Sequence, residues 1–138
     1  MQSVFFGPLL GMTVLIMVVW LLGVRERVSE MQQRRISPQS LAHPRDVSRL
    51  LERTNAMDNY NNLLQAPLLF YVLCLALAQN GIHSAPLLGA AWLYVLLRCV
   101  HSMIQVGANR VVPRFYVWLA SSVLLWGMWL GFAWMMWG

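Results

Sequence analysis

The chain has 138 residues, of which 59% are hydrophobic and 11% are charged, and its mean hydropathy is +0.56. Soluble domains carry about 25% charged residues, so this composition excludes a water-soluble globular protein. The net charge of +5 does not indicate a nucleic-acid partner, because all ten basic residues are arginines and most lie in one loop beside apolar stretches.

Four apolar stretches follow one another along the chain, and each is long enough for a helix to cross the roughly 30 Å hydrocarbon core of a bilayer. Backbone groups in lipid must be paired internally, which favours helices over isolated strands. The sequence therefore predicts an all-α, integral membrane four-helix bundle that forms one domain over residues 1–138. The helices are expected at about 5–24, 56–78, 86–106 and 115–137.

The connection at residues 25–55 is polar, is interrupted by Pro38 and Pro44, and holds seven of the ten arginines. Two more arginines lie in the connection at 107–114. Arginine-rich connections stay on the cytosolic side of a membrane. We therefore expect both connections to be cytosolic and both termini to lie on the opposite side of the membrane.

The start of the second span is unusually polar for a membrane helix. Asp58, Asn62 and Gln65 follow helical spacing, with Asn61 as an alternative to Asn62, so they share one face. Pro67 follows, and an apolar stretch begins after it.

The third span carries a second polar face, in its second half. The four residues at i, i+3, i+4 and i+7 are Arg98, His101, Ser102 and Gln105. An arginine inside a membrane needs partners, and we expect Asp58 to supply charge and Asn62 and Gln65 to supply acceptor oxygens. Two interpretations stay open: a hydrogen-bonded packing motif, or a site for an anionic guest such as a carboxylate, sulfonate or thiolate.

Arg110 and Arg114 lie at the cytosolic start of the fourth span, and Tyr116 follows. They are either interfacial anchors or groups that stabilise a thiolate, since a nearby guanidinium favours the ionised form of a thiol. Cys74 and Cys99 lie inside apolar spans without metal-ligand spacing, so we expect free thiols and no metal site.

The run from Asp58 to Tyr71, DNYNNLLQAPLLFY, resembles the second-helix motif of bacterial members of the MAPEG family, the membrane-associated proteins in eicosanoid and glutathione metabolism. That motif reads Asp-Asn-Phe, any residue, Asn-Leu-Phe-Glu, any residue, Pro-Val-Leu-Phe-Tyr. The stretch from Trp92 to Arg114 is also similar, as are the chain length, the four helices and the basic first connection.

The resemblance implies a homotrimer that binds glutathione as cosubstrate between subunits near the cytosolic face. It assigns glutathione binding to the polar residues already described, and thiol activation to Arg114 with Arg110 as its rival. The ligand-binding residues are Asp58, Asn62, Gln65, Arg98, His101 and Tyr116. The function implied is a transferase or peroxidase acting on small lipophilic electrophiles.

Gln65 departs from the motif, because the family usually has Glu at this position. Glutamine keeps an acceptor oxygen but loses the charge, which favours an alternative: a non-catalytic membrane protein that retains the scaffold. A proton-coupled drug exporter is less consistent, since the first span has no charge and Asp58 lies at a membrane edge. A haem-binding bundle needs two facing histidines, and only His101 lies deep within a span.

Overall fold

The computed structural model describes residues 4–137. Within that range the chain is helical and contains no strand. The helices are α1 (Phe6–Arg34), α2 (Pro44–Leu50), α3 (Asn55–Leu63), α4 (Pro67–Gln79), α5 (Ala85–Val106) and α6 (Val111–Trp137), with a 3-10 turn η1 (Pro38–Leu41) before α2.

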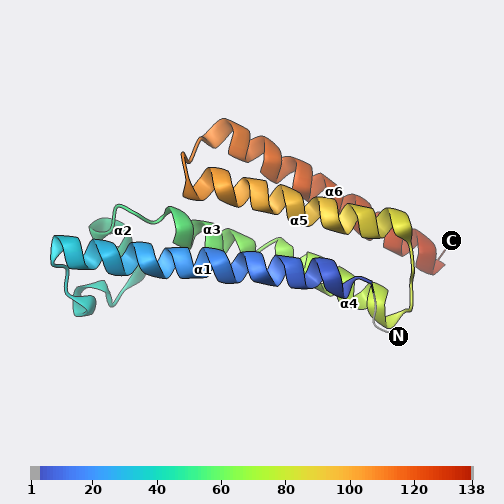
Figure 1. Cartoon of the computed structure of the whole chain (residues 1–138), viewed down its shortest axis with the longest axis horizontal. Helices are drawn as coiled ribbons and strands as arrows, with labels where there is room; N and C mark the ends of the chain where they lie inside the picture. Colours follow the sequence, from blue (N-terminus) through green and yellow to red (C-terminus); the bar gives the residue numbers. More distant parts are fainter. Residues whose placement is uncertain (1–3, 138) are drawn as a thin grey trace.

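Four helical segments of the described chain are long and apolar enough to cross a membrane: α1, α3 with α4, α5, and α6. This confirms the predicted all-α membrane fold. The helices pack as two neighbouring groups, α1 with α3 and α4, and α5 with α6 (Figure 1). Contacts of α5 with α1 and α3 join the two groups. The start of α1 and the end of α6 lie at one end of the bundle (Figure 1). The opposite end, which holds residues 25–55 and 107–114, is called the arginine-rich end.

The first helix is longer than the apolar stretch that defines it. It continues past Val24 to Arg34, so much of the predicted loop at 25–55 is helical, with η1 and α2 forming the rest of the structured part. Glu30 and Arg34 are four residues apart and form an ion pair of 2.9 Å, the spacing that supports a helix outside the membrane. The helix ends where Arg35 adopts the left-handed backbone conformation, with φ of 54°.

The second crossing is interrupted between α3 and α4. Pro67 starts α4 and has no N–H to donate to the carbonyl of Leu63, where α3 ends. The chain makes a tight turn through Gln65, whose N–H donates to the Asn62 carbonyl at 3.2 Å. The polar first part of this crossing is therefore a separate helix, and Gln65 lies exposed at the break.

A glycine allows α1 and α3 to approach closely at the arginine-rich end. A Cβ atom added at Gly23 would lie 3.3 Å from the backbone nitrogen of Met57 and 3.2 Å from its Cε atom. Only a hydrogen fits there without movement, so Gly23 sets the spacing between the two helices.

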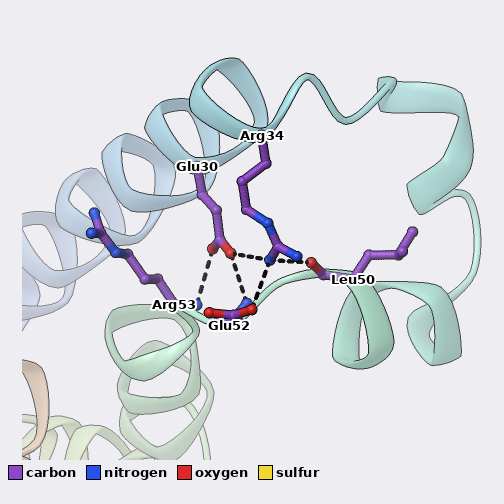
Figure 2. Close-up of polar contacts among 5 residues, drawn as sticks. All are labelled: Glu30, Arg34, Leu50, Glu52 and Arg53. Carbon is purple, nitrogen blue, oxygen red and sulfur yellow. Dashed lines mark hydrogen bonds and ion pairs between the residues drawn. The ribbon is translucent and has the colours of Figure 1, made fainter.

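Farther along α1 from Gly23, the carboxylate of Glu30 holds the segment that precedes α3 against α1 through hydrogen bonds (Figure 2). Its Oε1 atom accepts the N–H of Glu52 at 2.8 Å, and its Oε2 atom accepts the N–H of Arg53 at 3.0 Å. Arg34 donates to Glu30 at 2.9 Å and to the carbonyl of Leu50 at 2.8 Å. Glu30 is 3% exposed, so its carboxylate is enclosed by the groups that it binds.

Candidate functional site

Arg98 is the largest fully buried side chain of the described residues, with 0% exposure. Its Nη1 atom donates to Asn62 Oδ1 at 3.1 Å, and its Nε atom donates to the Tyr94 hydroxyl at 3.2 Å. The guanidinium carbon lies 5.3 Å from the centroid of the Tyr94 ring, which itself stacks on Phe70. The predicted inward orientation of Arg98 and its pairing with Asn62 are therefore observed.

Two of the predicted partners of Arg98 lie elsewhere. Gln65 is exposed at the break before Pro67, and no hydrogen bond joins it to Arg98 within residues 4–137. Asp58 is exposed and accepts the hydroxyl of Thr54 at 2.8 Å. The expectation that Asp58 neutralises Arg98 is therefore wrong, and the observed partners of the guanidinium are neutral groups.

His101 is 2% exposed and bridges α5 to the start of α6. Its Nε2 atom lies 3.0 Å from Gln105 Oε1, and its Nδ1 atom lies 3.3 Å from the carbonyl oxygen of Arg114. A neutral imidazole donates through only one nitrogen, so it satisfies one of these oxygens at a time. His101 thus orients Gln105 or the backbone of Arg114.

Arg114 belongs to a second group of polar contacts, at the corner between α5 and α6. Its Nη1 atom donates to Asn109 Oδ1 in a short hydrogen bond, and Asn109 Nδ2 donates to Asn55 Oδ1 at 3.0 Å. Asn55 is the first residue of α3. Asn109, which lies at the corner, is therefore hydrogen-bonded both to Arg114 near the start of α6 and to Asn55 at the start of α3.

A cavity of about 390 Å³ opens between α3, α5 and α6 at the arginine-rich end. One wall is polar and is formed by Asn62, His101, Gln105 and Arg114. The other wall is apolar or aromatic and belongs to α6: Val111, Phe115 and Trp118. Ligand pockets in proteins are typically about 300–1,000 Å³ and combine an apolar lining with a few convergent polar groups. The cavity has the size and lining of a small-molecule site.

The predicted site residues differ in whether they line this cavity. Asn62, His101 and Arg114 line this cavity, and Arg98 lies behind Asn62 without lining it. Arg110 and Tyr116 are exposed, as is Gln65, and none of the three lines the cavity. Asp58 lines a different cavity of about 560 Å³, beneath η1 and α2.

Sequence reasoning missed several residues that the fold brings to the site. Gln105 was placed on the polar face of the third span but given no role, although it follows His101 by one helical turn. Phe115 and Trp118 were hidden within an apolar span, where aromatic residues are common. Asn55 carried no signal, since its partner Asn109 lies far away in the sequence.

A family model matches nearly the whole chain, over residues 5–134, and describes the MAPEG family. The chain belongs to the MAPEG family. No curated protein and no solved structure matches it. Family membership agrees with the four membrane-spanning helices, and it makes the chain a membrane protein of a family associated with glutathione and eicosanoid metabolism.

Proposed function

We propose that this MAPEG protein is a glutathione-dependent transferase or peroxidase acting on lipophilic electrophiles. The observation that supports this most is the cavity in which Arg114, Asn62, His101 and Gln105 converge beside an apolar wall. Glutathione carries carboxylates, peptide groups and a thiol, so it suits a wall made of one guanidinium and several amide or imidazole groups.

The chemistry asks little of the protein beyond placing and ionising a thiol. The Arg114 guanidinium, partly exposed in the cavity wall, stabilises the thiolate and lowers the pKa of the bound thiol. The thiolate sulfur then attacks an electrophilic carbon, forming a carbon–sulfur bond while the leaving group or an opened epoxide oxygen takes the electron pair. With a hydroperoxide, the thiolate sulfur attacks one oxygen, the O–O bond breaks and an alcohol leaves. A second glutathione thiol then attacks the sulfur of the resulting sulfenic acid, which forms the disulfide and releases water.

The second substrate is a small lipophilic molecule that arrives through the bilayer. Val111, Phe115 and Trp118 give the cavity an apolar wall on α6, and α6 is long and apolar enough to lie in lipid. Such a substrate would meet the thiolate at the junction of the polar and apolar walls, where proximity supplies much of the rate.

The proposal includes a place in the cell and an assembly. The arginine-rich end is cytosolic, where glutathione is available, and the termini are periplasmic in a bacterial inner membrane. Three copies assemble as a homotrimer. Tyr116, Asp58 and Gln65, which lie outside the cavity of one subunit, are then available to complete a site shared between subunits.

The alternative function is a non-catalytic membrane protein that keeps the MAPEG scaffold. Gln65 favours it in two ways, because this residue replaces the usual glutamate and its side chain is exposed rather than directed into the cavity. If this alternative is correct, the cavity holds no glutathione at millimolar concentration.

Calorimetric titration of glutathione into purified, detergent-solubilised protein tests the proposal. We expect Arg114→Ala to weaken binding about tenfold or more, as loss of a charge-assisted hydrogen bond does. Arg110→Ala is the matched control, because this arginine is exposed on the same corner, and its binding should stay within about twofold of the wild type. Absence of wild-type binding would favour the alternative, and the oligomer mass measured on the same sample tests the homotrimer.

A further inference from the structure

Two side-chain hydrogen bonds connect the cavity arginine to Asn55, whose neighbour Ala56 is hydrogen-bonded to α1. Arg114 donates to the side chain of Asn109, and Asn109 donates to the side chain of Asn55 at 3.0 Å. These contacts connect α6, the corner before it and the first residue of α3. Asn55 in turn lies in the segment that α1 holds.

Two carboxylates of α1 fix the backbone on either side of Asn55. Glu30 accepts the N–H groups of Glu52 and Arg53 at 2.8 and 3.0 Å (Figure 2). Glu26 accepts the N–H of Ala56 at 3.2 Å. Glu26 and Glu30 are four residues apart on one helix face, so α1 grips the start of α3 at two points.

The backbone of Asn109 is also specialised. Its φ is 47°, in the left-handed region that glycine and asparagine adopt more readily than other residues. This conformation occurs in the turn after α5, where the Asn109 N–H donates to the carbonyl of Ile104 at 2.7 Å. Asn109 therefore joins Arg114 to Asn55 through side-chain and backbone features that few other residues combine.

We propose that Asn55 and Asn109 are positioning residues for Arg114, and that Glu26 and Glu30 set the position of Asn55 from α1. The inference rests on the proposed function only in giving Arg114 a ligand. It makes the arginine-rich connection at residues 35–53 a regulatory element of the cavity. Displacing the connection frees the start of α3, removes a restraint from Arg114 and lowers the affinity of the cavity for its ligand.

The coupling between the connection and the cavity is reciprocal. If holding the connection against α1 raises ligand affinity by some factor, then a ligand bound at Arg114 shifts the connection toward its bound position by the same factor. The connection contains the arginines of residues 35–53, so its release is visible as trypsin cleavage after Arg45 and Arg49, both of which are exposed.

The first experiment needs no ligand. The arginines of the detergent-solubilised protein are labelled with phenylglyoxal, and the labelling rate of each is followed by mass spectrometry. Asn55→Ala should raise the rate at Arg114 about threefold to tenfold, since one hydrogen bond no longer restrains Asn109. Arg98 is the internal control for global unfolding, because it is 0% exposed in the folded protein. Asn61→Ala is the matched variant, because Asn61 is an exposed asparagine on the same helix as Asn55.

The effect from α1 is tested in the same way. Glu30→Gln should raise both trypsin cleavage of the connection and labelling of Arg114, while Glu52→Gln, which removes an exposed carboxylate from the same cluster, should change neither by more than about twofold. If Glu30→Gln releases the connection and leaves Arg114 labelling unchanged, the proposed coupling is wrong.

The second experiment separates positioning from folding. Asn109→Gly keeps the left-handed backbone but removes the amide, so glutathione binding should weaken about threefold to tenfold and the pKa of the bound thiol should rise. Asn109→Asp keeps the acceptor for Arg114, and Asn55 can donate to it after its amide turns, so this variant should recover binding. Equal loss in both variants would overturn the role of Asn109.

The two proposals fail in different ways. If the wild type binds no glutathione, the proposed function fails while the labelling and trypsin results still decide the coupling. If glutathione binds and Arg114 labelling ignores Asn55, Asn109 and Glu30, the coupling fails and the proposed function stands.

Discussion

Arg98 and Arg114 each donate to an asparagine Oδ1 atom, yet their surroundings differ. Arg98 is fully buried between α3 and α5 and is separated from the cavity by Asn62, whereas Arg114 is partly exposed and lines the cavity. A buried guanidinium without an acidic partner is costly, so its benefit must lie in what it holds in place. The comparison is consistent with our proposal, in which Arg98 orients the site and Arg114 binds the ligand.

The largest effect should come from removing the buried member of this pair. Arg98→Ala leaves Asn62 Oδ1 and the Tyr94 hydroxyl without their donor and creates a cavity, which we expect to cost about 2–4 kcal/mol of stability. Thermal unfolding in detergent measures it. Arg98→Lys should not restore stability, because an ammonium cannot reach two acceptors as a planar guanidinium does. Near wild-type unfolding of Arg98→Ala would contradict the assignment.

The next effect concerns Arg114, and it should appear in binding rather than in stability. Arg114→Lys keeps the positive charge but loses the planar fork that contacts Asn109, so glutathione should bind about threefold to tenfold more weakly. The unfolding midpoint should stay close to that of the wild type, since Arg114 is only partly buried. A large loss of stability without loss of binding would reverse the roles of the two arginines.

Glu30 lies in the part of α1 beyond the apolar stretch, and its effect should depend on pH. The hydrogen bond from the N–H of Glu52 lowers the pKa of Glu30 most; the N–H of Arg53 and the Arg34 side chain lower it further, and burial opposes them. A carboxyl group with a lowered pKa adds stability above its ordinary value of 4.5, and that stability is lost as the pH falls through the folded-state pKa.

Unfolding of wild type and Glu30→Gln over a pH series measures this contribution. We expect the variant to be about 1 kcal/mol less stable near neutral pH, and the two curves to converge in acid. A constant difference at all pH values would show that the lost contribution is packing and not the ionised carboxylate.

The smallest effect is expected at Gln65, which lies outside the cavity. Gln65→Glu restores the residue that the family motif usually carries, and an exposed charge contributes only about 0.5 kcal/mol. We therefore expect glutathione to bind about twofold to threefold more tightly. Weaker binding in the same titration would mean that Gln65 has been placed at the wrong motif position.

Hydropathy predicted the four crossings because each is a long apolar run, and helical spacing predicted that Asn62 and Arg98 face inward. Neither method found the break before Pro67, which depends on one missing N–H and turns Gln65 away from Arg98. The pairing of Asn55 with Asn109 was not predictable either, because it joins two corners through tertiary packing and has no period in the sequence. The extension of α1 to Arg34 was not predicted, because the charged residues after Val24 had been assigned to a loop outside the membrane.

The close approach at Gly23 has a consequence for how the two halves of the arginine-rich end are kept together. Gly23, Glu26 and Glu30 follow one another along the same side of α1, so a side chain larger than hydrogen at the first position would act as a wedge. The wedge would widen the gap that both carboxylates must span. The absence of a side chain at Gly23 therefore decides whether the carboxylates of Glu26 and Glu30 reach the backbone N–H groups that they accept. In this way the helix spacing in the bilayer sets the position of the segment outside it.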